Sequence, residues 1–376
     1  MWCIATHAQH IPLEVVCDLP DILEENSGMI AINDSTLLFL NDSGNEPCIY
    51  VVNDRCSILG THCLTGIKNT DWEELAVDSK GNIYIADMGN NRNNRTNVQI
   101  YKIGIEQLRS GKTATPETIH ITYTDSAPRE NKQLMYDIES LYWHNDSLYF
   151  FSKNRRPMYD GVAWVFAVLD RPGQYTASPV DSITMPGFIR HLSWITAADY
   201  EPSSRLLLLL GSDQISVYHH EQGQKPYHGK RKTFSLRHLT QKEAVAFGHA
   251  FVFVSDERNP KLGGNRLYRF PKKLLYEKME LDILSLPVDF QISIAKKTVT
   301  DTLQVSFILP YATNVRWEVF DQSGERKSVG KTIEYNRGFH TLNIPSDALK
   351  PGFYVLNIVI DGQPNAYQVT KIVNGK

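Results

Sequence analysis

A short pattern returns five times along the chain, and this repetition constrains the fold more than any single motif does. In each copy a polar residue opens an apolar segment, a turn follows, and a second apolar segment ends on another polar residue. The copies span residues 26–42, 71–88, 137–153, 198–213 and 243–257. Because such a unit must bury its apolar faces against its neighbours, the pattern predicts a repeat architecture.

The repeated segments have the composition of β-strands, with 18 Tyr and 15 Phe in the chain and short runs of Val and Ile. The second unit continues with strand-like segments at 82–87, 98–103 and 117–124, separated by turns. Four antiparallel strands per unit, repeated around an axis, predict an all-β fold of the β-propeller class. A plain β-sandwich is the alternative, but it does not explain why the polar positions recur in register.

The number of blades follows from the pattern. A direct count predicts five, and residues 187–194 leave room for a sixth. The last unit, residues 242–271, shows only three clear strands, whereas residues 13–17 precede the first unit without a partner. We expect this N-terminal segment to supply the missing outer strand, which would close the ring and remove two open edges.

The spacing of the polar positions predicts where a site lies. In four copies a polar residue near the start of the first segment lies fourteen residues before a polar residue at the end of the second: Ser27 and Asn41, Glu73 and Asp87, Glu139 and Lys153, Glu243 and Glu257. The start of one strand and the end of the next lie at the same end of a hairpin, so these pairs should converge at one mouth of the channel. Their structural interpretation is that they cap strand ends and tie neighbouring blades together.

A functional interpretation is that the mouth binds a ligand. The candidate ligand-binding residues are Ser27, Asn41, Asp42, Glu73, Asp87, Asn90, Asn91, Asp137, Glu139, Lys153, Asp199, Glu243 and Glu257. Acids gathered in one place raise each other's pKa, and a cation such as calcium would relieve this through oxygen ligands. The candidate metal ligands are Asp42, Glu73, Asp87, Asp137, Glu139 and Glu243.

Charge and cysteine content narrow the class of protein. The net charge of −3 provides no basic surplus for nucleic acid, and no stretch is long enough to span a membrane. The five cysteines lie in the first 63 residues, and their odd number predicts buried free thiols or one disulfide. Residues 1–9 read as the end of a secretory signal peptide or as a disordered terminus. We expect a monomer.

Several motifs together resemble an uncharacterised family of secreted bacterial propeller proteins. They are Glu25-Asn26-Ser27-Gly28, Asn41-Asp42-Ser43-Gly44-Asn45, Asp71-Trp72-Glu73-Glu74 and Asp87-Met88-Gly89-Asn90-Asn91-Arg92, followed by Arg95. This resemblance covers most of residues 20–270 and implies a propeller over 10–271, but it brings no activity with it. The run from Asn90 to Arg95 is either a turn or a lid whose arginines pair with Asp42, Asp137 or an anionic ligand.

A second β pattern starts near Leu286, after a linker predicted over residues 272–285. It predicts a small immunoglobulin-like sandwich of about seven strands over 286–376. The stretches Val319–Gly324, Gly338–Ile344, Leu349–Leu356 and Lys371–Val373 resemble the C-terminal sorting domain of the type IX secretion system. The resemblance implies that the secretion machinery is a partner and that the chain is secreted or displayed on the outer membrane. An ordinary immunoglobulin-like module is the alternative.

Three functions stay open at this point. The first is an exported propeller that binds a ligand or partner at its polar mouth. The second is a calcium-type hydrolase of lactones or phosphoesters, in which His191 and Lys153 could assist. The third is a purely structural surface protein. No Gly-x-Ser-x-Gly motif is present, which argues against serine-hydrolase chemistry.

Overall fold

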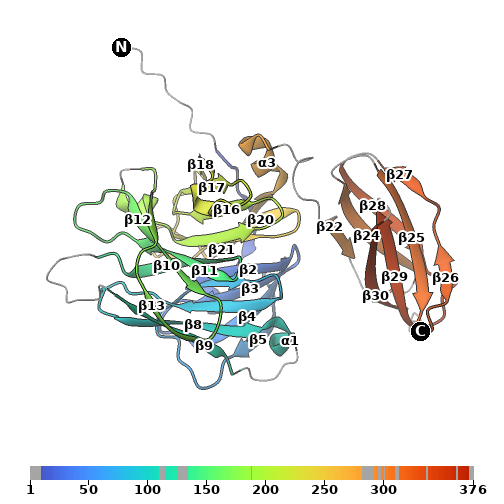
Figure 1. Cartoon of the computed structure of the whole chain (residues 1–376), viewed down its shortest axis with the longest axis horizontal. Helices are drawn as coiled ribbons and strands as arrows, with labels where there is room; N and C mark the ends of the chain where they lie inside the picture. Colours follow the sequence, from blue (N-terminus) through green and yellow to red (C-terminus); the bar gives the residue numbers. More distant parts are fainter. Residues whose placement is uncertain are drawn as a thin grey trace, which may run out of the picture. The chain divides into compact units, whose positions relative to one another are not determined.

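The computed structural model (Figure 1) describes residues 10–109, 115–124, 134–187, 189–281, 291–294, 298–299, 301–309, 313–335, 338–360 and 363–371. The chain forms two compact units, Met1–Leu281 and Asp282–Lys376. The predicted signal remnant at 1–9, which includes Cys3, lies outside the described residues. In the described part of the chain, we find no helix with the length and apolar character needed to cross a membrane.

Five β-sheets follow one another along the first unit, and each is a blade of a propeller. Blade 1 contains β2 (Asn26–Asn33), β3 (Thr36–Asn41), β4 (Cys48–Asn53) and β5 (Ile58–Cys63). Blade 2 contains β6 (Trp72–Val77), β7 (Asn82–Asp87), β8 (Asn97–Gly104) and β9 (Glu117–Tyr123). Blade 3 contains β10 (Asp137–His144), β11 (Ser147–Lys153), β12 (Val162–Leu169) and β14 (Asp181–Thr184).

Blade 4 contains β15 (Ala197–Glu201), β16 (Leu206–Leu210), β17 (Gln214–His219) and β18 (Lys230–Ser235). Blade 5 contains β19 (Lys242–Phe247), β20 (Phe251–Asp256), β21 (Arg266–Pro271) and β1 (Glu14–Asp18). The innermost strands contact one another in a closed cycle, β2–β6–β10–β15–β19–β2. Within the described residues the ring therefore has five blades, and the stretch considered for a sixth carries the short helix α2 (Arg190–Ser193) instead.

The apolar core of the propeller lies between its blades, because the inner strands are buried on both faces. Leu206, Leu208 and Leu210 of β16 pack toward blade 5, whereas Leu207 and Leu209 pack toward blade 3. Each of the five apolar clusters of the first unit joins two neighbouring blades in this way. This explains why strands such as β16 are apolar throughout rather than alternating.

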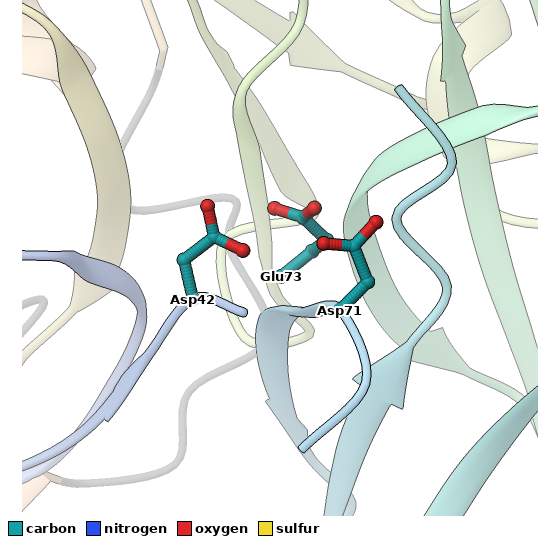
Figure 2. Close-up of side chains that lie close together, drawn as sticks. All are labelled: Asp42, Asp71 and Glu73. Carbon is teal, nitrogen blue, oxygen red and sulfur yellow. The ribbon is translucent and has the colours of Figure 1, made fainter. Parts of the chain in front are cut away.

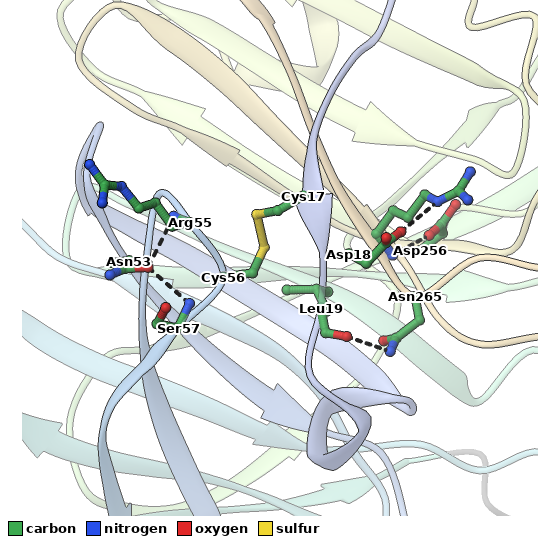
Figure 3. Close-up of a disulfide and its surroundings, with 10 residues drawn as sticks. Cys17, Asp18, Leu19, Asn53, Arg55, Cys56, Ser57, Asp256 and Asn265 are labelled. Carbon is green, nitrogen blue, oxygen red and sulfur yellow. Dashed lines mark hydrogen bonds and ion pairs between the residues drawn. A yellow bond between two sulfur atoms is a disulfide. The ribbon is translucent and has the colours of Figure 1, made fainter.

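The ring is closed by the N-terminal strand, as the unpartnered segment predicts. Strand β1 pairs antiparallel with β21 and becomes the outermost strand of blade 5. A disulfide from Cys17 of β1 to Cys56, in the turn between β4 and β5, ties this strand to blade 1 (Figure 3). Disulfides form and persist in oxidising compartments.

The expectation of free thiols or one disulfide is wrong, because a second disulfide joins Cys48 to Cys63 within blade 1. These two residues lie opposite each other where β4 pairs with β5. The odd number of cysteines could not predict these two pairs. Strand pairing and ring closure bring together cysteines that are 15 and 39 residues apart in the sequence.

Several smaller elements complete the first unit. Strand β13 (Gly173–Ala177) leaves blade 3 and pairs in parallel with β9 at the outer edge of blade 2. Short helices are η1 (Asp21–Leu23), α1 (Ile105–Arg109), η3 (Pro226–His228) and α3 (Lys273–Met279). Helix α3 lies in the stretch predicted as a linker, but its Leu275 and Met279 are buried in the core between blades 4 and 5.

The second unit is a sandwich of two sheets around its own core. One sheet contains β22 (Gln291–Ile294), β24 (Thr302–Leu309) and β28 (Gly338–Pro345). The other contains β23 (Thr298–Val299), β30 (Gln363–Lys371), β29 (Gly352–Ile360), β25 (Thr313–Asp321), β26 (Arg326–Val329) and β27 (Ile333–Tyr335). The described residues thus hold nine strands, and the last part of the sorting-domain motif, 372–373, lies outside them.

Candidate functional site

Four of the five inner strands begin with the same irregularity. In β2, β6, β10 and β19 the pairing register shifts, which leaves one extra residue as a β-bulge. The extra residues are Ser27, Glu73, Glu139 and Glu243. A bulge bends its strand and re-aims a side chain. The inner strand of blade 4, β15, pairs with β16 without a shift, so this blade contributes no equivalent group.

Three carboxylates come together between blades 1 and 2. Asp42 follows β3, Asp71 precedes β6, and Glu73 is the bulged residue of β6. One ligand oxygen from each lies within 4.8 Å of the others, and Figure 2 shows the three side chains close together. We call these residues the acidic cluster. Carboxylate oxygens in such an arrangement can coordinate a hard cation.

The backbone makes room for the acidic cluster at Gly89. This glycine follows β7, and its N–H donates to the carbonyl of Asp71 at 3.1 Å. A Cβ at this position would lie 2.5 Å from Asp71 Cγ and closer still to Glu73 Oε1. Only a glycine lets the backbone at this position of the Asp87-Met88-Gly89 motif lie so close to the two carboxylates.

The environment of the acidic cluster disfavours three negative charges. Burial, and then the charges of Glu139, Asp42 and Asp71, raise the pKa of Glu73 well above its ordinary value. Burial and the neighbouring Asp42 raise the pKa of Asp71 to about 6. Burial also raises the pKa of Asp42. A bound cation would lower these pKa values again, because it stabilises the charged form of each carboxyl group.

Two basic side chains lie beside this cluster, and both are already paired. Lys153 forms an ion pair with Glu139, and Arg155 forms ion pairs with Asp137 and Glu139. Burial raises the pKa of Glu139 to about 7, although the positive charges of Lys153 and Arg155 act to lower it. Burial would lower the pKa of Lys153, but Glu139 and other carboxylates raise it above its ordinary value.

Glu243 and Glu257 complete this acidic end of the channel. Burial raises the pKa of Glu243 well above its ordinary value, with Glu139 and Glu257 adding to the shift and Lys153 opposing it. Burial and the charge of Asp42 raise the pKa of Glu257 to about 7. The bulged acids and their neighbours therefore affect one another across blades 1, 2, 3 and 5.

Two of the predicted metal ligands accept hydrogen bonds from protein donors. Asp87 accepts hydrogen bonds from Arg95, from Gln99 and from the N–H of Asp71. Asp137 accepts from Arg155 and from the N–H of Asn90. Their oxygens are occupied by protein donors and lie outside the acidic cluster, so Asp42 and Glu73 are the predicted ligands that the cluster contains.

The loop after β7 is a turn in which Arg95 pairs within the fold. Asn90 Oδ1 accepts from the N–H groups of Asn94 and Arg95, at 2.7 and 2.9 Å. Arg95 pairs with Asp87 at 2.8 Å, rather than with Asp42 or Asp137. Asn91 Oδ1 accepts a hydrogen bond from Arg155.

The remaining predicted residues divide between the mouth and the interior. Ser27 Oγ lies 3.2 Å from Glu73 Oε2, and Asn41 Nδ2 donates to the carbonyl of Ile22 at 2.7 Å. Asp199 does not lie at this mouth. It accepts from the N–H of Phe247, at the far end of β19, because β15 has no bulge to bring an acid to the near end.

Sequence reasoning missed two residues of this region. Asp71 was recognised only as part of a motif, although it lies two residues before Glu73, a spacing that places side chains on one side of extended backbone. Glu74 was missed because it crosses the channel: its Oε2 accepts from the N–H of Ala198, in β15, at 3.0 Å. No local pattern signals a contact between residues 124 positions apart.

No protein-family model and no curated protein matches this chain, so both family resemblances stay predictions. Among solved structures, it is similar to PorZ of Porphyromonas gingivalis, a surface component of the type IX secretion system, at 8% identity and TM-score 0.33. This match covers 92% of the present chain and 45% of the PorZ chain, so the chain spans less than half of that protein.

Two further solved structures show the same degree of similarity. A protein from Lactobacillus plantarum is 13% identical, with 93% of this chain and 85% of that chain covered and a TM-score of 0.33. An exo-β-1,3-galactanase from Clostridium thermocellum is 9% identical, with 89% and 87% covered and a TM-score of 0.35. Similarity at this level assigns no function to the chain.

Proposed function

We propose that this chain is an exported binding propeller that recognises a ligand or partner at the acidic end of its channel. A cation of the calcium type, held by Asp42, Asp71 and Glu73, is part of this site in our proposal. The observation that carries it is the convergence of these three carboxylates beside a glycine that leaves them room. Within the described residues, no ion pair involves any of the three.

The donor set favours a hard cation over a transition metal. It consists of carboxylate oxygens, with no His or Cys among the three residues. Ca²⁺ takes six to eight oxygen ligands in flexible geometry, whereas structural zinc sites use the sulfur of Cys and the nitrogen of His. Three carboxylates leave coordination positions for water or for ligand oxygens, which is how a cation would contribute to recognition.

Calorimetric titration of the full chain with calcium tests the cation site. We expect binding heat in the wild type and its loss in Asp71→Asn and Asp42→Asn. Glu117→Gln, an exposed acid on the outer strand β9, is the matched control and should bind as the wild type does. Absence of heat and of a thermal shift in the wild type would rule out the cation.

Export is supported by the chain itself. The two disulfides are typical of oxidising compartments outside the cytoplasm. The C-terminal sandwich has the fold expected for the sorting module that its motifs resemble. Deleting residues 286–376 in a bacterium with a type IX secretion system should abolish export of the chain. Unchanged surface display after this deletion would refute the sorting role.

A second candidate function is metal-dependent hydrolysis. Glu139, the bulged acid of blade 3, has a pKa near neutrality and lies close enough to raise that of Glu73. A carboxyl group of this kind can accept a proton from a water molecule. A panel of lactones and phosphoesters tests this, with Glu139→Gln expected to abolish any turnover. Calcium binding without turnover would favour recognition, and absence of both would favour a structural role.

A further inference from the structure

A pocket opens beside the acidic end of the channel, between the loops of blades 3, 4 and 5. Its volume is about 290 Å³, near the lower end of the range for small-molecule sites. Lys153 and Glu243 of the channel mouth line it, together with Trp194. It adjoins the proposed ligand-binding mouth.

Trp194 is held in place by contacts on several sides. Its Nε1 donates to the carbonyl of Asn154 at 2.5 Å, and the ring of His191 meets it edge-on at 4.6 Å. Lys153 Nζ and Arg155 Cζ lie 5.2 and 5.0 Å from the indole centroid. An aromatic wall that is fixed before binding loses little conformational entropy when a flat ligand stacks on it.

The polar lining suits a ligand that both donates and accepts hydrogen bonds. The hydroxyls of Ser212 and Thr196 already donate to the carbonyls of His191 and Lys242, so their oxygens remain as acceptors. Lys153 carries three N–H donors, one of which is used by Glu139. Hydroxyl groups, which donate and accept at once, match such a lining.

The charges around the pocket disfavour ionic ligands of either sign. An anion would meet Glu243 and, behind it, Glu139 and Glu257. A cation would meet Lys153 in the wall, with Arg155 over the same indole.

The rim of the pocket is apolar and exposed. Leu239 and Leu262 lie on loops of blades 4 and 5, line the pocket, and have 60% and 56% of their surfaces exposed. They could contact the C–H faces of a second ring that extends out of the pocket.

We propose that this pocket binds the terminal ring of a neutral saccharide, with one C–H face stacked on Trp194 and hydroxyls bonded to Lys153, Glu243 and Ser212. This inference rests on the proposed ligand recognition at the mouth, and it names the class of ligand. No residue of the acidic cluster lines this pocket, so binding of the saccharide does not require the cation.

The test uses the full chain and a panel of neutral sugars: glucose, galactose, mannose, N-acetylglucosamine and their disaccharides. Saturation-transfer NMR on the wild type should show contact between aromatic protons and sugar C–H protons for at least one of them. Glucuronic acid and glucosamine are the charged arms of the panel. Absence of signal from every neutral sugar, or binding of the charged sugars alone, overturns the inference.

Variants locate the binding. Trp194→Ala should weaken saccharide affinity about tenfold or more, and Trp194→Phe should retain much of it because the flat ring remains. Trp164→Ala is the matched control, since Trp164 also has a cation 5.5 Å from its ring, that of Arg156, but does not line the pocket. Equal losses in the two alanine variants would overturn the assignment to this pocket.

Calcium titration of the same samples separates this inference from the proposed function. Calcium heat without any saccharide signal overturns the saccharide inference and leaves the cation site in place. A saccharide signal that depends on Trp194, without calcium heat, supports the pocket and overturns the cation. Absence of both overturns both.

Discussion

The carboxyl group of Glu74 crosses the centre of the propeller and joins strands that are not neighbours. Its two oxygens accept hydrogen bonds from the N–H groups of Ala198 and Leu75, at 3.0 and 2.9 Å. The close approach of β2 to β6 at Gly28, where a Cβ would lie 2.7 Å from Leu75 N, narrows the channel at the same level. Single residues therefore both fill the channel and keep its blades in contact.

Replacing Glu74 should destabilise the propeller in a graded way. Glu74→Ala leaves two buried N–H groups without acceptors and should lower the free energy of unfolding by about 2–4 kcal/mol. Glu74→Gln keeps one acceptor and should cost less, about 1–2 kcal/mol. Urea unfolding measures both, with Glu117→Ala on the surface as the control. Equal stability of all variants would contradict the bridging role.

Substitution of Gly89 tests whether calcium binding needs the space beside the acidic cluster. Gly89→Ala would push a methyl group against Asp71 and Glu73. We expect calcium affinity to fall about tenfold or more, because the carboxylates must move apart. Gly104→Ala, where the added carbon would lie 3.7 Å from the nearest atom, is the control. Calorimetry that gives the same affinity for both variants would show that the cluster is not the calcium site.

At the scale of elements, ring closure depends on a strand that comes from the other end of the unit. Strand β1 has exposed or half-buried side chains and is held by its pairing with β21. The disulfide to Cys56 holds it from the opposite side, on blade 1 (Figure 3). Blades 5 and 1 are thus joined covalently at the point where the chain closes the ring.

Removing this disulfide should loosen the closure. Cys17→Ser with Cys56→Ser should cost about 2–4 kcal/mol and expose the N-terminal strand to protease before the rest of the propeller. The pair Cys48→Ser with Cys63→Ser is the control, because that disulfide lies within blade 1 and its loss leaves β1 attached. Thermal melts and limited proteolysis distinguish them. Early cleavage near β1 in both pairs would contradict this account.

At the scale of the whole molecule, the buried acids make the stability of the fold depend on pH in an unusual direction. Burial first, and then neighbouring carboxylates, raise the pKa of Glu257 and Glu139 to about 7 and that of Asp71 to about 6. Their pKa values are ordinary, near 4, in the unfolded chain. The folded state therefore binds more protons than the unfolded state between about pH 4 and 7, and stability falls as pH rises through this window.

We expect the Tm of the calcium-free chain to rise by a few degrees when the pH is lowered from about 7 to about 5. In a domain of this size 1 kcal/mol corresponds to about 2–4 °C. Calcium should stabilise the chain more at pH 7 than at pH 5, because protons and cation compete for the same oxygens. Scanning calorimetry at both pH values checks this. A calcium-free Tm that increases steadily with pH would contradict it.

Repetition was enough to predict the propeller, its five blades and the closing strand, because stacked units must bury apolar faces on both sides. Likewise, the alternation after residue 286 was enough to predict the C-terminal sandwich. These features depend on the local pattern of apolar and polar residues, which strand periodicity translates directly into buried and exposed faces.

Tertiary structure alone decided which polar groups share a site. The bulges of β2, β6, β10 and β19 turn Ser27, Glu73, Glu139 and Glu243 to the mouth, and a bulge depends on pairing with the next strand. Asp87 and Asp137 were expected beside them, yet neighbouring N–H groups and arginines occupy both. The repeat thus determined the ring of blades, whereas contacts between distant residues determined the acidic cluster, the Glu74 bridge and the Trp194 pocket.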